Sequence, residues 1–296
     1  MSTATANDTQ PIVRRANLDF GLEEDIPRHW FGGDAFKSRF FDAMSLLFPE
    51  GEKFFIDCVR DYKAEVTDPE LIQEVKDFTF QEGQHSMVHI RYNNHLERQG
   101  INVPAIMEQQ RRMIGWTRKK FPRKNTLAET AAAEHITAMM AEYILGHPED
   151  MGEADPRIRA IYFWHAIEET EHKAVAFDVL QKVAGAGYFT RIFGLIAETI
   201  LFPFFIFQIM RHMFRRDGFN RRERLKLWSK GLWWLYGPPH GLFVRMLPTY
   251  LSYYKPGFHP WQNKTSRAFD HWLTEYENHD HDPIAASNRF IGAIGK

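Results

Sequence analysis

Apolar residues recur at alternating steps of four and three along three long segments, the spacing of helices packed in a bundle. Asp68-Pro69 and Asp155-Pro156 each place a capping carboxylate before a proline at the first helical position. Gly100 and Gly146 mark helix ends. The sequence therefore predicts helices over Pro69 to about Arg98, Asn125 to Leu145, and Pro156 to about Val183.

A shorter segment adds a fourth helix, which we expect to begin near Pro49-Glu50-Gly51 and to continue to about Lys63. No useful length of the chain alternates as a strand does, and no internal repeat is visible. The predicted fold is all-α: a ferritin-like four-helix bundle followed by a helical, aromatic-rich extension.

Ionisable side chains stand on the core-facing stripe of each predicted helix, where apolar residues belong. They are Glu52 in the first helix, Glu82, His85 and His89 in the second, Glu134 in the third, and His165, Glu169 and His172 in the fourth. Burial of several carboxylates without compensation is too costly to be credible. Two metal ions would neutralise them, because carboxylates bridge metals and imidazoles complete the coordination.

Six of these residues match the dinuclear pattern of one Glu from each of two helices and Glu-x-x-His from each of the other two. They are Glu52, Glu82, His85, Glu134, Glu169 and His172. His165 and His89 lie four residues from a ligand on the same face, so each is a further ligand or a hydrogen-bonded support. The alternative is a buried salt-bridge network without metal.

Other ionisable residues in the same helices fall off the stripes. We expect Glu168, Glu171, Glu142 and His135 to be solvated, and His95 and His147 to lie on the surface.

Composition narrows the class of protein. The 296 residues carry a net charge of −1, which gives no support to nucleic-acid binding. The single cysteine, Cys58, excludes a disulfide scaffold or a cysteine-rich metal site and fits a reducing, cytoplasmic compartment. The first ten residues are polar, which predicts a disordered tail rather than a secretory signal. We divide the chain into a polar tail and lead-in (1–33), a metal-binding bundle (34–187) and a basic, apolar extension (188–296).

The extension holds two apolar stretches, Ile192 to Met210 and Gly231 to Tyr254, on either side of eight Lys and Arg residues between Arg211 and Lys230. A hairpin of two membrane spans would place this basic loop against the positive-inside rule. Two interpretations stay open. The helices lie in the plane of the inner membrane surface as a peripheral attachment, or they cover the bundle in a soluble protein.

The segment from Pro49 to Val183 resembles the ferritin-like di-iron carboxylate superfamily. Within it, His165-Ala-Ile-Glu-Glu169-Thr-Glu-His172 is similar to the His-x-x-x-Glu-x-x-His helix of the p-aminobenzoate N-oxygenase group. That resemblance implies that His165 binds iron. The segments Phe80–His85, Trp164–Lys173 and Pro256–Trp261 also look like a bacterial family catalogued as predicted metal-dependent hydrolases.

These observations predict a di-iron oxidase or oxygenase that uses O2 as co-substrate to oxidise an apolar or aromatic small molecule. Two iron ions, or a manganese–iron pair, would be the cofactor, and an electron donor not identified by the sequence would reduce them. The first alternative is a dinuclear metal-dependent hydrolase, and the second is a non-catalytic iron-binding protein. The sequence leaves a homodimer open.

Overall fold

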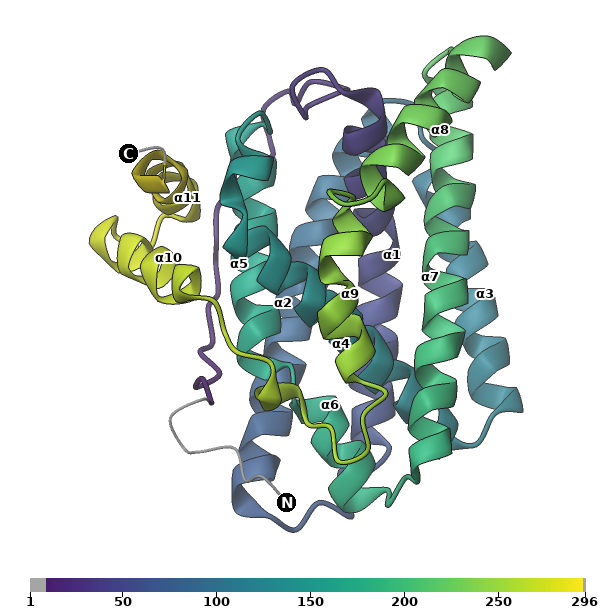
Figure 1. Ribbon diagram of the computed structural model, residues 1–296, viewed down its shortest axis with the longest axis vertical. Coiled ribbons are helices and arrows are strands. Elements are labelled where there is room, and N and C mark those ends of the chain that lie inside the picture. Colours follow the sequence, from purple (N-terminus) through teal and green to yellow (C-terminus); the bar gives the residue numbers. More distant parts are fainter. Residues whose placement is uncertain (1–8, 295–296) are drawn as a thin grey trace.

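Every regular element between residues 9 and 294 is a helix, which confirms the all-α class (Figure 1). The structure is a computed structural model, and it describes these residues. Its first part comprises α1 Ala35–Arg60, α2 Pro69–Arg98, α3 Val103–Lys120, α4 Arg123–Gly146, α5 Pro156–His172 and α6 Val175–Asp178, which a π-helical turn extends over Val179–Val183. Its second part comprises α7 Tyr188–Arg216, α8 Arg221–Tyr236, α9 Leu242–Ser252, α10 Arg267–Asn278 and α11 Pro283–Ile294.

Helices α1, α2, α4 and α5 run side by side along the long axis of the molecule (Figure 1). Helix α7 packs along α4 and α1, and α3 lies outside α1. The bundle therefore has its own core and a helical layer over one side.

Helix α1 begins at Ala35, so the predicted start near Pro49 is wrong. Asp34 caps it, because its carboxylate accepts hydrogen bonds from the amides of Phe36 and Lys37. Pro49 lies inside the helix and cannot donate to the carbonyl of Ser45. Asn93 on α2 donates to that carbonyl at 2.9 Å. A hydrogen bond between helices thus replaces the backbone hydrogen bond that the proline cannot form.

Two further boundaries differ from the prediction. Helix α3 was not predicted. Its fully buried residues are Val103 and Gln110, and Ile106, Met107 and Ile114 pack partly buried against the core. Helix α5 ends at His172 and does not continue regularly to Val183. Just beyond it, Lys173 donates to the carbonyl of Asn263 and lies over the ring of Trp261. The loop after α9 is thereby fastened to the end of α5.

The lead-in before α1 packs against the bundle and is not merely polar. Phe20, Ile26, Trp30 and Phe31 are buried, and the ring of Phe20 lies 5.5 Å from that of Trp164 on α5. Residues 1–8 of the predicted tail lie outside the described residues.

Helices α7 and α8 join the bundle through glycines that permit close approach. A Cβ at Gly194 of α7 would lie 2.3 Å from the carbonyl oxygen of Ala128 on α4. A Cβ at Gly231 of α8 would meet the ring of Phe36 on α1 at 2.1 Å. The hydrophobic core is therefore continuous across the predicted boundary at residue 187.

Candidate metal centre

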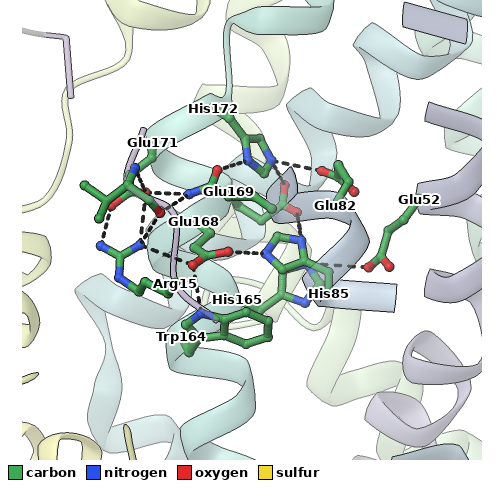
Figure 2. Close-up of polar contacts among 12 residues, drawn as sticks. Arg15, Glu52, Glu82, His85, Trp164, His165, Glu168, Glu169, Glu171 and His172 are labelled. Carbon is green, nitrogen blue, oxygen red and sulfur yellow. Dashed lines mark hydrogen bonds and ion pairs between the residues drawn. The ribbon is translucent and has the colours of Figure 1, made fainter. Parts of the chain in front are cut away.

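The bundle brings the eight predicted site residues together near its middle. Figure 2 labels Glu52, Glu82, His85, His165, Glu169 and His172 among them. None has more than 5% of its surface exposed. Helix α1 supplies Glu52, α2 supplies Glu82, His85 and His89, α4 supplies Glu134, and α5 supplies His165, Glu169 and His172. The i, i+3 spacing within α2 and α5 turns each Glu-x-x-His pair toward the same interior.

His172 faces three carboxylates through one ring nitrogen. Its Nε2 lies 3.1 Å from Glu82, 3.4 Å from Glu134 and 3.7 Å from Glu169. Its Nδ1 donates to the amide oxygen of Gln81 at 2.7 Å. Burial opposes a charge on His172, but the carboxylates outweigh burial and raise its pKa well above the usual value. A metal cation would take the place of that proton.

His85 presents the other ring nitrogen to the centre. Its Nε2 donates to Glu168 at 3.1 Å, while its Nδ1 has no hydrogen-bond partner and lies 3.7 Å from Glu169. Burial, and then the neighbouring His165, lower the pKa of His85 well below the usual value. The ring is therefore neutral, with a free lone pair directed into the site.

His165 reaches the centre, and His89 stands behind it. His165 Nε2 lies 2.9 Å from Glu169 and 3.9 Å from Glu52. Its Nδ1 is hydrogen-bonded to His89 at 2.9 Å, and His89 is hydrogen-bonded in turn to Ser45 at 2.9 Å. Both ring nitrogens of His89 thus have hydrogen-bond partners, and His89 also forms a possible ligand group with Glu52 and His165.

The donor atoms fit metal ions. Seven buried atoms of the centre have no hydrogen-bond partner: Glu52 Oε1, both carboxylate oxygens of Glu82 and of Glu134, His85 Nδ1 and His172 Nε2. Buried polar atoms are otherwise almost always paired. The centre contains four groups of three possible ligand atoms, and the three atoms of each group lie within 4.8 Å of one another. Carboxylate and imidazole donors suit first-row divalent metals such as iron, manganese or zinc.

Without a bound cation, ionisation of most carboxyl groups of the centre is unfavourable. Burial, and then repulsion between neighbouring carboxylates, raise the pKa of Glu52 and Glu82 well above the usual value and that of Glu134 to about 7. Burial also opposes ionisation of Glu169, but the hydrogen bond with His165 and the nearby His172 ring outweigh it and lower its pKa well below the usual value.

Glu168 and Glu171 are buried, so their predicted solvation is wrong. Arg15 of the lead-in pairs with Glu168 at 3.2 Å and with Glu171 at 2.7 Å (Figure 2). Every residue from Ile158 to His172 is buried, because the lead-in and α11 cover the back of α5. An amphipathic pattern therefore does not describe this helix.

Arg15 and Gln81 are functional candidates that the sequence reasoning missed. Gln81 donates to Glu171 at 2.7 Å and accepts from His172, so Arg15, Glu171 and Gln81 form a hydrogen-bonded chain that ends on a ligand. The signal was the excess of acids in Glu-Glu-Thr-Glu at 168–171, which required a cation from elsewhere in the chain.

The remaining off-stripe residues are not all exposed either. His135 and His95 are buried, which corrects their predicted exposure, and Glu142 and His147 are half-buried. Burial lowers the pKa of His135 to about 4, and its ring packs 4.7 Å from that of Tyr253.

The segment Pro256–Trp261 packs beside the end of the bundle. His259 pairs with Asp178 after α5 at 3.0 Å, and Phe258 packs on His135. These residues lie outside the eight of the centre.

An apolar cavity of about 360 Å³ lies between α3, α4 and α7. A smaller pocket of about 30 Å³ reaches His165 and Glu169, and the two share Phe48, Thr137 and Phe202 as lining residues. Thr137 donates a hydrogen bond to Glu169. Phe202 thus borders both the cavity and the pocket that reaches His165 and Glu169.

Two acids interrupt the apolar wall of the cavity. Glu129 and Glu198 face each other, and burial together with this contact raises the pKa of Glu198 well above the usual value.

Comparison with known proteins gives one match. No curated protein and no solved structure matches the chain. The model of one family, described as a predicted metal-dependent hydrolase, matches residues 13–264, which include every residue of the centre as well as Arg15. The chain therefore belongs to this family of predicted metal-dependent hydrolases.

Proposed function

We propose that the protein is a dinuclear metal enzyme that uses O2 to oxidise an apolar small molecule. One observation carries the proposal: an apolar cavity shares Phe48, Thr137 and Phe202 with a pocket that reaches His165 and Glu169, at a centre of four buried carboxylates and three histidines. Bound there, two iron ions would supply the electrons that reduce O2.

The chain itself holds and orients the ligands. Glu168 and Gln81 each accept a hydrogen bond from the ring nitrogen that points away from the centre, which fixes the orientation of His85 and His172. Arg15 neutralises the acids behind them. Thr137 fixes Glu169 at the end of the cavity. The ligands are thus set before any substrate binds.

The cavity selects the substrate and excludes water. Phe48, Phe55, Ile136 and Phe202 line its inner part, so an apolar molecule gains by leaving water for this space. Such a molecule approaches Glu169 past Phe202, which lines both the cavity and the pocket beside Glu169. A dry site also protects a reactive intermediate from side reactions.

Hydrolysis is the second candidate, and the family's description favours it. Metal ions at this centre would lower the pKa of a bound water. The scissile group would then have to enter through apolar walls whose acids are Glu129 and Glu198. Non-catalytic iron binding ranks third, because storage has no use for a substrate cavity.

One experiment separates these functions. Protein produced with iron is analysed for metal, reduced without oxygen, and mixed with O2 while its spectrum is followed. We expect iron and rapid O2 consumption. In parallel, the protein loaded with zinc or manganese is given ester and phosphate substrates without oxygen. Cleavage at enzymatic rates in that arm, with no reaction toward O2, would establish the hydrolase instead.

A further inference from the structure

The outer face of α7 carries a row of exposed apolar side chains, which we name the α7 ridge. The ridge consists of Phe189, Phe193, Ile196, Ile200 and Phe204, with exposed fractions of 86, 53, 46, 63 and 58%. The steps of four, three, four and four place all five on one face of the helix. The opposite face packs on α4 and α1, so the ridge belongs to an ordered helix of the fold.

Cations stand at both ends of the ridge. At one end Arg211 continues the same face and Arg215 follows it one turn later, both exposed. At the other end, Trp116 of α3 lines the same cavity as Phe193 of the ridge, and the exposed Lys119 and Lys120 follow Trp116 at the end of α3. None of these four cations forms an ion pair with any residue of the range 9–294. An apolar surface with free cations at its edges is complementary to an anionic lipid surface.

A membrane span through α7 does not fit this arrangement. Helix α7 is long and apolar enough to cross a bilayer, and 22% of its most apolar window is buried. However, α3 borders the same cavity as α7 and carries the exposed, charged Arg111 and Arg112. Charged groups on a neighbouring helix cannot follow α7 into the hydrocarbon. The arrangement therefore favours in-plane contact over a span.

A second copy of the chain is a poorer occupant than lipid. Both ends of the ridge are cationic, so two ridges facing each other in parallel or antiparallel would bring free cations against free cations. An anionic bilayer offers negative charge to the cations at both ends of the ridge.

The mouth of the cavity opens beside the ridge. Trp116 and Phe121 of α3 and Phe193 of the ridge are exposed and also line the cavity. A molecule leaving a docked bilayer would therefore pass from acyl chains to the apolar walls without crossing water.

We propose that the α7 ridge docks in plane on an anionic lipid surface and that the cavity takes a lipid-soluble substrate directly from it. The docking follows from the surface alone, and the choice of substrate rests on the proposed function.

Vesicle sedimentation tests the docking. The full-length protein is mixed at low salt with phosphatidylcholine vesicles that contain or lack phosphatidylglycerol. We expect binding that requires phosphatidylglycerol and weakens with salt, because salt screens the cations. The variant Lys119→Glu/Lys120→Glu should bind at least about 25-fold more weakly, since each cation near an anionic surface contributes about fivefold. Ile200→Asp/Phe204→Asp should bind at least about tenfold more weakly.

A control replaces two exposed apolar residues on another helix, Met87 and Ile90, which are 46 and 43% exposed. Met87→Asp/Ile90→Asp on α2 should bind as the unaltered protein does. The docking proposal fails if the unaltered protein stays in solution with anionic vesicles, if the ridge variant binds normally, or if the ridge variant only converts a dimer to a monomer. Metal content and the O2 reaction without vesicles report on the proposed function separately, and the ridge variants should leave both unchanged.

Discussion

The two Glu-x-x-His motifs present different ring nitrogens to the centre. His85 gives its Nε2 to Glu168 and keeps Nδ1 free, whereas His172 gives its Nδ1 to Gln81 and keeps Nε2 free. His165 stands on the His85 side, where the two rings stack at 4.0 Å. The two halves of the centre are therefore chemically distinct, with more imidazole on one side.

Glu134 lies on the side of His172, and its loss should release metal. Both of its carboxylate oxygens are buried without hydrogen-bond partners. We expect Glu134→Ala to lower the bound metal to one ion or less per chain, as measured by elemental analysis. Glu142→Ala, on the half-buried face of the same helix, should keep full metal. Full occupancy in Glu134→Ala would show that this residue is not a ligand.

His165 and His89 should differ in the size of their effects. His165 faces Glu169 and Glu52, while His89 contacts His165 and Ser45. We expect His165→Ala to change the visible spectrum of the oxidised protein and to cut turnover by about 100-fold or more. Residues that only support a metal ligand typically contribute about 10- to 100-fold. His89→Ala should change the spectrum less. An unaltered spectrum in His165→Ala would make this residue structural only.

At the scale of elements, one buried ion pair fastens the start of α1 to the end of α7. Arg39 donates to Asp217 at 2.6 and 2.9 Å, and both side chains are almost fully buried. Arg39 also pairs with Asp42 at 2.8 Å. This contact fixes α7 against α1, and both helices line the cavity.

Asp217→Asn should destabilise the protein by about 3 kcal/mol, because it leaves Arg39 partly unpaired in the interior. Urea unfolding measures this free energy. Asp57→Asn, which removes an exposed pair with Lys53, should cost well under about 1 kcal/mol.

The effect of Asp217 should also depend on pH. Burial opposes its ionisation, but hydrogen bonds from His29 and Arg39 outweigh burial and lower its pKa to about 2. A carboxyl whose pKa is lower in the folded state contributes stability above its unfolded value of about 3.9. That contribution should disappear as pH falls from about 4 to about 2. A difference between Asp217→Asn and the unaltered protein that stays constant over this interval would contradict the assignment.

At the scale of the whole molecule, metal binding and folding should be coupled. The ligands come from α1, α2, α4 and α5, so no ligand set exists until the bundle has formed. Removing metal leaves carboxylates facing one another in the interior. Metal at about 100 times its dissociation constant should add about 2.7 kcal/mol to the free energy of unfolding. Calorimetry with and without chelator measures the shift, and Glu134→Ala should show a smaller one. Identical melting temperatures with and without metal would exclude the coupling.

The sequence by itself determined three of the four bundle helices and the residues on their inner stripes. Helical spacing is local: positions three and four residues apart share a face wherever the helix lies. Glu82 with His85 and Glu169 with His172 were therefore placed together before any packing was known. The glutamates on these stripes also predicted a metal site, because buried carboxylates require compensating cations.

The tertiary structure decided what depends on contacts between distant segments. Pro49 is tolerated inside α1 because Asn93 of α2 donates a hydrogen bond to the carbonyl of Ser45, which the proline leaves without a helical partner. Glu168 is buried because the lead-in covers α5 and supplies Arg15. The outer face of α7 is exposed because α4 and α1 occupy its other side. Periodicity shows which residues share a face, but what covers that face is decided by partners far away along the chain.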